Sequence, residues 1–139
     1  MYIRSILEQS SVVWHSSLTE ENSSDLERIQ KCAVKIILGK RYNNYEDALQ
    51  KVDLPTLNER REELCLNFGR KCIKNEKTKT MFPERVKIHQ MLNRNEEKFE
   101  VKHANTERFL KSAIPHMQRL LNDEKNNEKD IRISSRMPK

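Results

Sequence analysis

The cysteines and histidines are the residues of this 139-residue chain whose side chains could hold a metal ion. They are Cys32, Cys65, Cys72, His15, His89, His103 and His116. Their spacings match neither zinc-finger nor zinc-knuckle patterns. Cys65 and Cys72 lie seven residues apart on one apolar helix face, where a free cysteine behaves as a small hydrophobic side chain. We therefore predict that these two cysteines pack in a core, that His15 packs against the core from a loop, and that the chain holds no metal.

Acidic residues give no catalytic pattern. The five aspartates are scattered, with no adjacent pair: Asp25, Asp47, Asp53, Asp123 and Asp130. Two-metal phosphoryl chemistry needs carboxylates that converge on ions about 4 Å apart. P-loop, GxGxxG and HExxH motifs are also absent from the sequence. We predict no catalytic residue, no cofactor and no enzymatic activity for this chain by itself.

The basic side chains form the one pattern in this sequence that indicates a function. At 100° per residue, Arg28, Lys31 and Lys35 fall within about 60° of one another on a helix. Phosphate contacts by such an arc give affinity for nucleic acid without reading its sequence. A solvated polar helix face has the same pattern, so both interpretations stay open. The predicted nucleic-acid-binding residues are Arg28, Lys31, Lys35, Lys40, Arg41, Arg60, Arg70, Lys71 and Lys74.

Composition limits the class of protein that can carry this arc. Apolar and charged residues each make up 35% of the chain, and Leu, Ile, Val and Phe number 33 of 139. That is about 24%, above the roughly 20% typical of disordered chains. With 2 Gly and 4 Pro, an all-β sandwich rich in tight turns is disfavoured. The composition favours one small helical domain with a thin core.

Charge and cysteine content indicate the environment and the partner. The net charge is +6, divided as −3 in residues 1–30, +4 in 31–75 and +5 in 76–139. Such a basic excess is typical of proteins that bind polyanions, most often nucleic acid. Arg4 and Glu8 interrupt the first apolar stretch, so no signal peptide is visible, and no apolar run is long enough to span a membrane. Three cysteines fit reduced thiols in the cytosol or nucleus and a protein that is not secreted.

The first half of the chain should supply the helices that carry the arc. Residues 2–14 have helical spacing but no residue that could cap their start. Thr19 should begin a second helix and Gly39 should end it. The apolar face predicted for that helix consists of Leu26, Ile29, Ala33 and Ile37.

Two further helix starts are encoded by capping residues. Asn44 should cap a short helix that ends near Val52. Thr56 and Glu59 form a T-x-x-E capping box, which opens a helix over residues 57–74. Arg61 falls inside the apolar stripe of that helix. Its stem should lie along apolar surface, with its head reaching either solvent or a buried acid.

The second half is less regular. We expect a polar loop over 75–80 and irregular structure over 84–105, with one short extended piece around 99–102. Thr106 should cap a short helix, and Pro115 suits the first turn of another that runs through Leu121. The predicted fold is all-α, a small helical bundle with an irregular extension. The predicted divisions are a helical domain over 1–75, an extension over 76–122 and a disordered, mobile tail over 123–139.

Three stretches of the sequence resemble one family. IRSILEQSSVVWHSSLTEENSSDLERIQKCAVKIILGKRY is similar to the segment that follows the catalytic palm in reverse transcriptases of non-LTR, LINE-like retrotransposons. LPTLNERREELCLNFGRKCIKN resembles the helix that comes next in that family, and NTERFLKSAIPHMQRLLN resembles its closing segment. The order and the spacing agree, and the resemblance covers most of residues 2–122. Gln9-Ser10 departs from the pattern, since relatives commonly carry an aromatic and a small residue there.

The resemblance implies RNA-directed DNA synthesis by a parent enzyme, in which this segment forms the helical thumb and the C-terminal tail. The palm, with its Tyr-x-Asp-Asp turn and its bound Mg²⁺, is absent from this sequence and would lie upstream. A thumb holds the template–primer duplex through backbone contacts in the shallow groove of an A-like hybrid. We therefore expect weak, sequence-independent binding to an RNA–DNA hybrid or duplex.

Two alternatives remain. The chain could be a small helical interaction module derived from a transposon, in which exposed apolar faces bind a partner or a second copy. It could also be a remnant without a role.

Overall fold

Helices make up most of the described part of the chain in this computed structural model. The structure describes residues 2–84, 99–103 and 105–134, without the side chains of 2, 3, 125 and 127–134. Among these residues there is no strand, only an isolated antiparallel bridge between Glu84 and Phe99. The all-α fold predicted from sequence is confirmed. The helices are α1 (Tyr2–Glu8), α2 (Ser11–Trp14), η1 (His15–Ser17), α3 (Glu20–Leu38), η2 (Gly39–Arg41), α4 (Tyr45–Val52), α5 (Leu57–Lys74), α6 (Glu76–Lys79), α7 (Glu107–Leu110) and α8 (Ala113–Ser134).

Two compact units divide the chain, Met1–Cys65 and Leu66–Lys139. Their boundary falls inside α5, ten residues before the division predicted at 75. A long amphipathic helix can supply apolar residues to two cores, one from each half of its length. Each unit is therefore described by itself.

Side-chain caps set the helix starts of the first unit as predicted. The hydroxyl of Thr19 accepts from the backbone N–H of Asn22 at 3.2 Å. The Asn44 side chain caps α4 in the same way. Thr56 and Glu59 form the full capping box, each side chain accepting from the other residue's backbone N–H at 3.2 Å.

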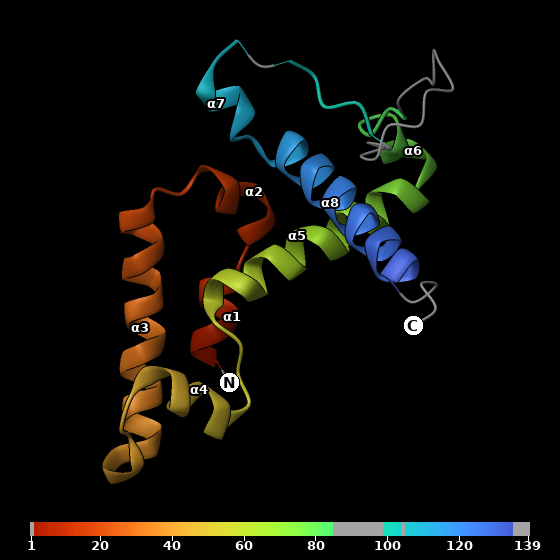
Figure 1. The fold of residues 1–139 in the computed structure, drawn as a ribbon. Helices are drawn as coiled ribbons and strands as arrows, with labels where there is room; N and C mark the ends of the chain where they lie inside the picture. The colour runs from red at the N-terminus through yellow and green to blue at the C-terminus, as the bar shows by residue number, and fades with distance from the viewer. Residues whose placement is uncertain (1, 85–98, 104, 135–139) are drawn as a thin grey trace. The chain divides into compact units, whose positions relative to one another are not determined.

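The core of the first unit lies where α3 and α4 run side by side (Figure 1). Val34 of α3 packs with Ala48 and Leu49 of α4. The surrounding half-buried side chains are Leu38, Tyr42, Tyr45, Val52 and Leu54. These contacts tie α4 and the loop before it to the second half of α3.

The buried face of α3 differs from the predicted one. Gln30 and Val34 are buried, whereas Ile29 and Ile37 of the predicted stripe are 48% and 67% exposed. Gln30 can occupy the interior because its amide donates to the hydroxyl of Tyr45 at 3.1 Å and to the carbonyl of Pro55 at 3.2 Å. A polar side chain with partners is tolerated where periodicity alone predicts an apolar one.

The predicted helix over 2–14 is two helices. Ser10 adopts a left-handed backbone conformation with φ 53°, which separates α1 from α2. The indole N–H of Trp14 donates to the carbonyl of Gln9 at 3.0 Å across this break. His15 is buried in η1, as predicted for a residue packed against the core.

Arg61 is fully buried in the first unit, so its head does not reach solvent. It donates to the hydroxyl of Ser23 at 2.9 Å, and its guanidinium carbon lies 5.9 Å from the centre of the Trp14 ring. Burial lowers the pKa of the Arg61 guanidinium, and the nearby Glu27 carboxylate opposes that shift.

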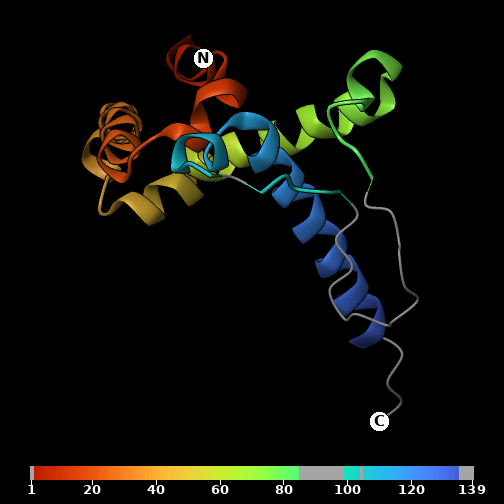
Figure 2. The same ribbon diagram turned by 90° about the horizontal axis from the view of Figure 1, so that it is seen from above.

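The second unit packs around the first half of α8. Figures 1 and 2 show α8 following α7 after a short turn. Gly69 lies against α8, since a Cβ there would come within 3.1 Å of the side chain of Leu121. Phe82 and Phe99 meet edge to face, with ring centres 6.1 Å apart. Asn122 holds Phe99 by two hydrogen bonds, accepting from its N–H at 3.0 Å and donating to its carbonyl at 3.2 Å.

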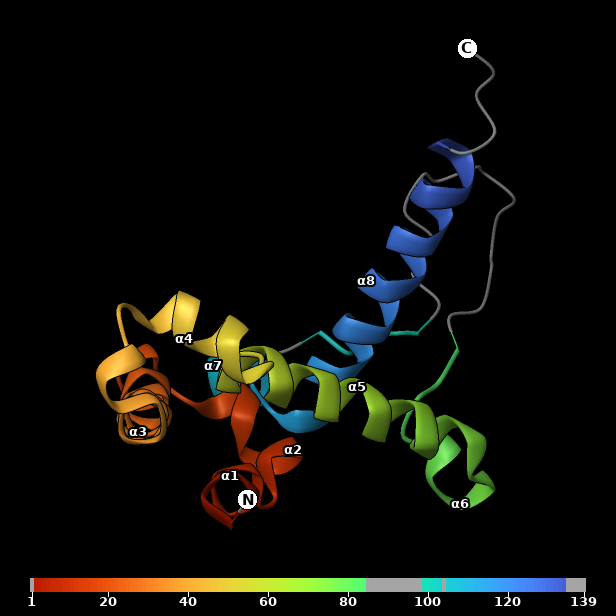
Figure 3. The same ribbon diagram turned by 90° about the horizontal axis from the view of Figure 1, so that it is seen from below.

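Two segments of the second unit are more helical than predicted. Asn75 caps the short helix α6 within the expected polar loop, just beyond the end of α5 (Figure 3).

The last helix was predicted to end at Leu121 and a mobile tail to begin at 123, but α8 continues through Ser134. Arg70 of α5 forms an ion pair with Glu124, two residues beyond Asn122 in α8. Glu and Lys also have good helix propensities, which an analysis of apolar periodicity overlooks. Residues 135–139, and 85–98 of the predicted irregular segment, lie outside the described residues.

Candidate nucleic-acid interface

Eight of the nine predicted nucleic-acid-binding residues are exposed, and Arg60 is half-buried. Six lie in the first unit: Arg28, Lys31 and Lys35 on α3, Lys40 and Arg41 in η2, and Arg60 on α5. Arg70, Lys71 and Lys74 belong to the second unit. The structure therefore brings together the residues of α3 and η2, while a single surface made of all nine stays a prediction.

Acidic partners engage three of the nine cations. Arg60 contacts Glu63 at 2.7 Å and Glu8 at 3.5 Å. Arg28 contacts Asp25 at 3.5 Å, between two largely exposed side chains. Arg70 pairs with Glu124, as noted above. A cation already paired with a carboxylate gains less from a phosphate, because the existing contact must be given up.

The remaining cations of the first unit form a more available group. Within the described ranges, no carboxylate pairs with Lys31, Lys35, Lys40 or Arg41. These four side chains lie on the second half of α3 and on the turn that follows it. We call them the α3 basic group. It is the part of the predicted arc in the first unit that is exposed and has no carboxylate partner within the described residues; Lys71 and Lys74 of the second unit share these two properties.

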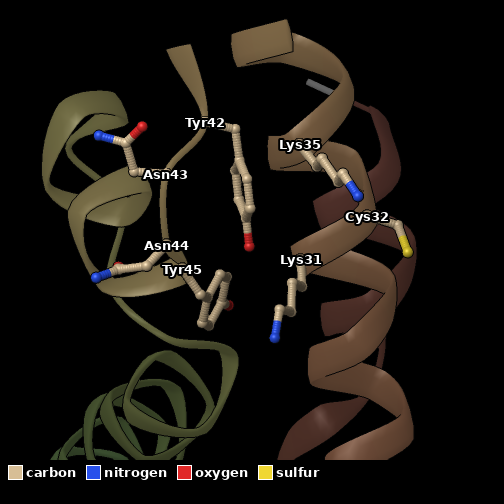
Figure 4. A pocket seen from close by; sticks show the side chains of 7 residues that line it. All are labelled: Lys31, Cys32, Lys35, Tyr42, Asn43, Asn44 and Tyr45. Atoms are coloured by element: carbon tan, nitrogen blue, oxygen red, sulfur yellow. The ribbon is translucent and has the colours of Figure 1, made fainter. Parts of the chain in front are cut away.

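A groove opens beside this group. Its volume is about 450 Å³, and it is lined by Lys31, Cys32, Lys35, Tyr42, Asn43, Asn44 and Tyr45. Figure 4 shows the two tyrosine rings reaching into the space between the loop and α3, while the amides of Asn43 and Asn44 point away from α3. No acidic residue lines this groove, in contrast to a second groove of about 350 Å³ that includes Glu8 and Asp53.

Hydrogen bonds hold the aromatic wall of the groove in place. The hydroxyl of Tyr45 donates to the carboxylate of Glu27 and accepts from Gln30. Burial and the bond to Glu27 raise the pKa of the Tyr45 phenol. The ammonium of Lys31 lies 5.9 Å from the centre of the Tyr45 ring, a cation–π contact. Lys51 donates to the carbonyl of Arg41 at 3.3 Å, which ties η2 to α4.

Tyr42 and Tyr45 were missed by the reasoning that selected cations by helical face. The sequence nevertheless carries a signal for them, because KRYNNY places two aromatics directly after two basic residues at the end of a helix. Basic residues interleaved with aromatics are typical of surfaces that bind single-stranded nucleic acid.

The cysteines differ in burial, and His89 lies outside the described residues. Cys65 and Cys72 are buried, as predicted for core residues, and Cys32 is exposed at the groove. Among the described residues, no three His, Cys, Asp or Glu side chains lie close enough together to hold a metal ion. None of the described helices combines the length and apolar character needed to cross a lipid bilayer.

The comparisons with known proteins assign no family. Neither models of protein families, nor curated proteins, nor solved structures give a match to this chain.

Proposed function

We propose that this chain contacts the sugar–phosphate backbone of an RNA–DNA hybrid or duplex, as the thumb of a non-LTR retrotransposon reverse transcriptase does, without polymerase activity of its own. The observation that carries the proposal is the α3 basic group, whose four cations are exposed and lack a carboxylate partner among the described residues. The three stretches that resemble the family, in the family's order, support the same assignment. This activity belongs in the cytosol or the nucleus.

Physical chemistry makes the expected binding weak and salt-dependent. Each ammonium or guanidinium that meets a phosphate releases a condensed counterion, so affinity falls steeply with salt concentration. Contacts of lysine and arginine with phosphates carry no direct sequence information, so sequence preference should be small.

The test is fluorescence anisotropy with a labelled RNA–DNA hybrid over a range of salt concentrations. The triple variant Lys31→Gln, Lys35→Gln, Lys40→Gln should weaken binding and reduce the slope of log K against log salt by roughly two to three units. The matched control is Lys77→Gln, Lys79→Gln, Lys102→Gln, which removes three exposed lysines of the second unit. Equal losses in the two variants, or affinity independent of salt, would refute the proposal.

The absence of polymerase activity has its own assay. Purified chain, supplied with a primed RNA template, Mg²⁺ and deoxynucleotides, should extend no primer. Extension that survives repeated purification would contradict this part of the proposal.

A second candidate function is an interaction module. Several apolar side chains of the first unit are strongly exposed, with Ile36 at 82%, Val13 at 71%, Ile6 at 69% and Ile37 at 67%. Exposed apolar residues of this kind mark surfaces that bind a partner or a second copy. Light scattering after size exclusion should then show self-association that Ile36→Lys reduces. A wild-type chain that stays monomeric at all accessible concentrations would count against self-association.

A further inference from the structure

We propose that the groove between α3 and the loop before α4 holds one unpaired nucleotide of a nucleic-acid strand, with its base stacked on Tyr42 and its phosphate between Lys31 and Lys35. This inference rests on the proposed function, and it goes further because it names a single-stranded element that a duplex-gripping surface does not need.

The shape and lining of the groove support a planar, anionic ligand. Its volume of about 450 Å³ lies within the roughly 300–1,000 Å³ typical of small-molecule sites. Two lysines supply positive charge, and no carboxylate lines the groove to oppose it. Glu46 and Asp47 follow in the first turn of α4 but do not line the groove.

The two tyrosines have different roles in this arrangement. Tyr45 is fixed by Glu27 and Gln30 through its hydroxyl and contacts Lys31 through its ring, so it forms a rigid wall. Tyr42 packs partly against the core of Val34, Ala48 and Leu49 and also lines the groove. No hydrogen bond involves the Tyr42 hydroxyl among the contacts of the described residues. Its ring is the available stacking platform.

The site should accept any base. Every base has a π face, so stacking on an aromatic ring tolerates sequence. The amides of Asn43 and Asn44, which could read a base edge, point away from α3 (Figure 4). The side chain of Asn44 is already engaged as the cap of α4.

The experiment compares two fluorescently labelled hairpins, one blunt and one with a short single-stranded extension. Wild-type protein should bind the extended hairpin about tenfold more tightly, within the range that stacking of a base on an aromatic side chain contributes. Tyr42→Leu keeps an apolar group on the core and removes the ring, so it should abolish the difference in affinity between the two hairpins. Tyr42→Phe keeps the ring and should retain the difference. Phe109→Leu, at an exposed ring of the second unit, is the matched control.

The outcomes separate this inference from the proposed function. If wild type binds the blunt hairpin but gains nothing from the extension, the groove assignment fails and the proposed function stands. If the blunt hairpin does not bind while the extended one does, through Tyr42, the groove assignment stands and duplex contact fails. An unchanged tenfold preference in folded Tyr42→Leu, with folding checked by circular dichroism, would also overturn the assignment. Displacement of the hairpin by adenosine monophosphate at comparable concentrations would assign the groove to a free nucleotide and not to a strand.

Discussion

The carboxylate of Glu27 in α3 accepts two hydrogen bonds from the backbone N–H of Leu57, the first residue of α5, at 3.1 and 3.3 Å. The same carboxylate accepts from the hydroxyl of Tyr45 in α4. One side chain therefore connects three helices of the first unit. It also supplies negative charge at the start of α5, where the helix dipole and the free N–H groups favour it.

Glu27→Gln should lower the free energy of unfolding by about 1–2 kcal/mol, because it removes the negative charge at the start of α5 and replaces one of the two oxygens that accept from the Leu57 N–H with an NH2 group, which can only donate. Urea unfolding followed by circular dichroism measures the change. Glu21→Gln, at an exposed position in the first turn of the same helix, is the control and should cost less. A loss for Glu27→Gln no larger than that of the control would contradict this role.

Stability should fall above pH 10 through Tyr45. Burial and the bond to Glu27 raise the pKa of Tyr45 in the folded protein, so the unfolded chain loses the phenolic proton first. The contribution of this group is complete below the unfolded pKa of about 10 and is lost as pH rises beyond it. Tyr45→Phe removes the titration. The stability difference between wild type and Tyr45→Phe should therefore be constant from pH 6 to about 9 and shrink above pH 10. A difference that stays constant to pH 11 would refute the assignment.

Replacing Arg61 by an apolar residue should cost less stability than removing its partner, the hydroxyl of Ser23. Two guanidinium nitrogens of Arg61, Nε and Nη1, have no hydrogen-bond partner within the described part of the chain. Arg61→Met should therefore keep the free energy of unfolding within about 1 kcal/mol of wild type, since a well-packed apolar chain replaces a costly buried charge. Ser23→Ala removes the acceptor at 2.9 Å and should cost about 1–3 kcal/mol. Chemical denaturation of both variants is the measurement, and a larger loss for Arg61→Met than for Ser23→Ala would contradict the argument.

Local capping chemistry made much of the fold predictable. Thr19, Asn44, Thr56 and Thr106 each begin a helix within one residue of the expected position, because their caps depend only on neighbours in sequence. Gly39 ends α3 with φ 52°, a conformation that favours glycine.

Features that depend on distant partners were not predictable. The orientation of α3 depends on Gln30 finding Tyr45 and Pro55, fifteen and twenty-five residues away. Glu124 of α8 pairs with Arg70, fifty-four residues away. The spacing of apolar residues along the sequence does not reveal either of these distant partners.

The candidate site likewise has features that sequence predicts and features that it does not. Exposure of the α3 cations follows from helical spacing, so sequence predicts it. The pairing of Arg60 with Glu8 and the groove walls formed by Tyr42 and Tyr45 arise only when α1, α3, α4 and α5 pack together. Choosing residues by helical face therefore identified the basic side chains of α3 but not the aromatic side chains of Tyr42 and Tyr45.

The three cysteines should differ sharply in reactivity. Cys32 is exposed, whereas Cys65 is 1% exposed and burial raises the pKa of its thiol to about 11. The thiolate is the reactive species, so at pH 8 Cys65 should be alkylated only when the first unit opens. Iodoacetamide labelling read by peptide mass spectrometry should show rapid modification of Cys32 and slow modification of Cys65 and Cys72. In urea, all three should react at similar rates. Native Cys65 that reacts as fast as Cys32 would mean that the protein interior around Cys65 is not closed to solvent.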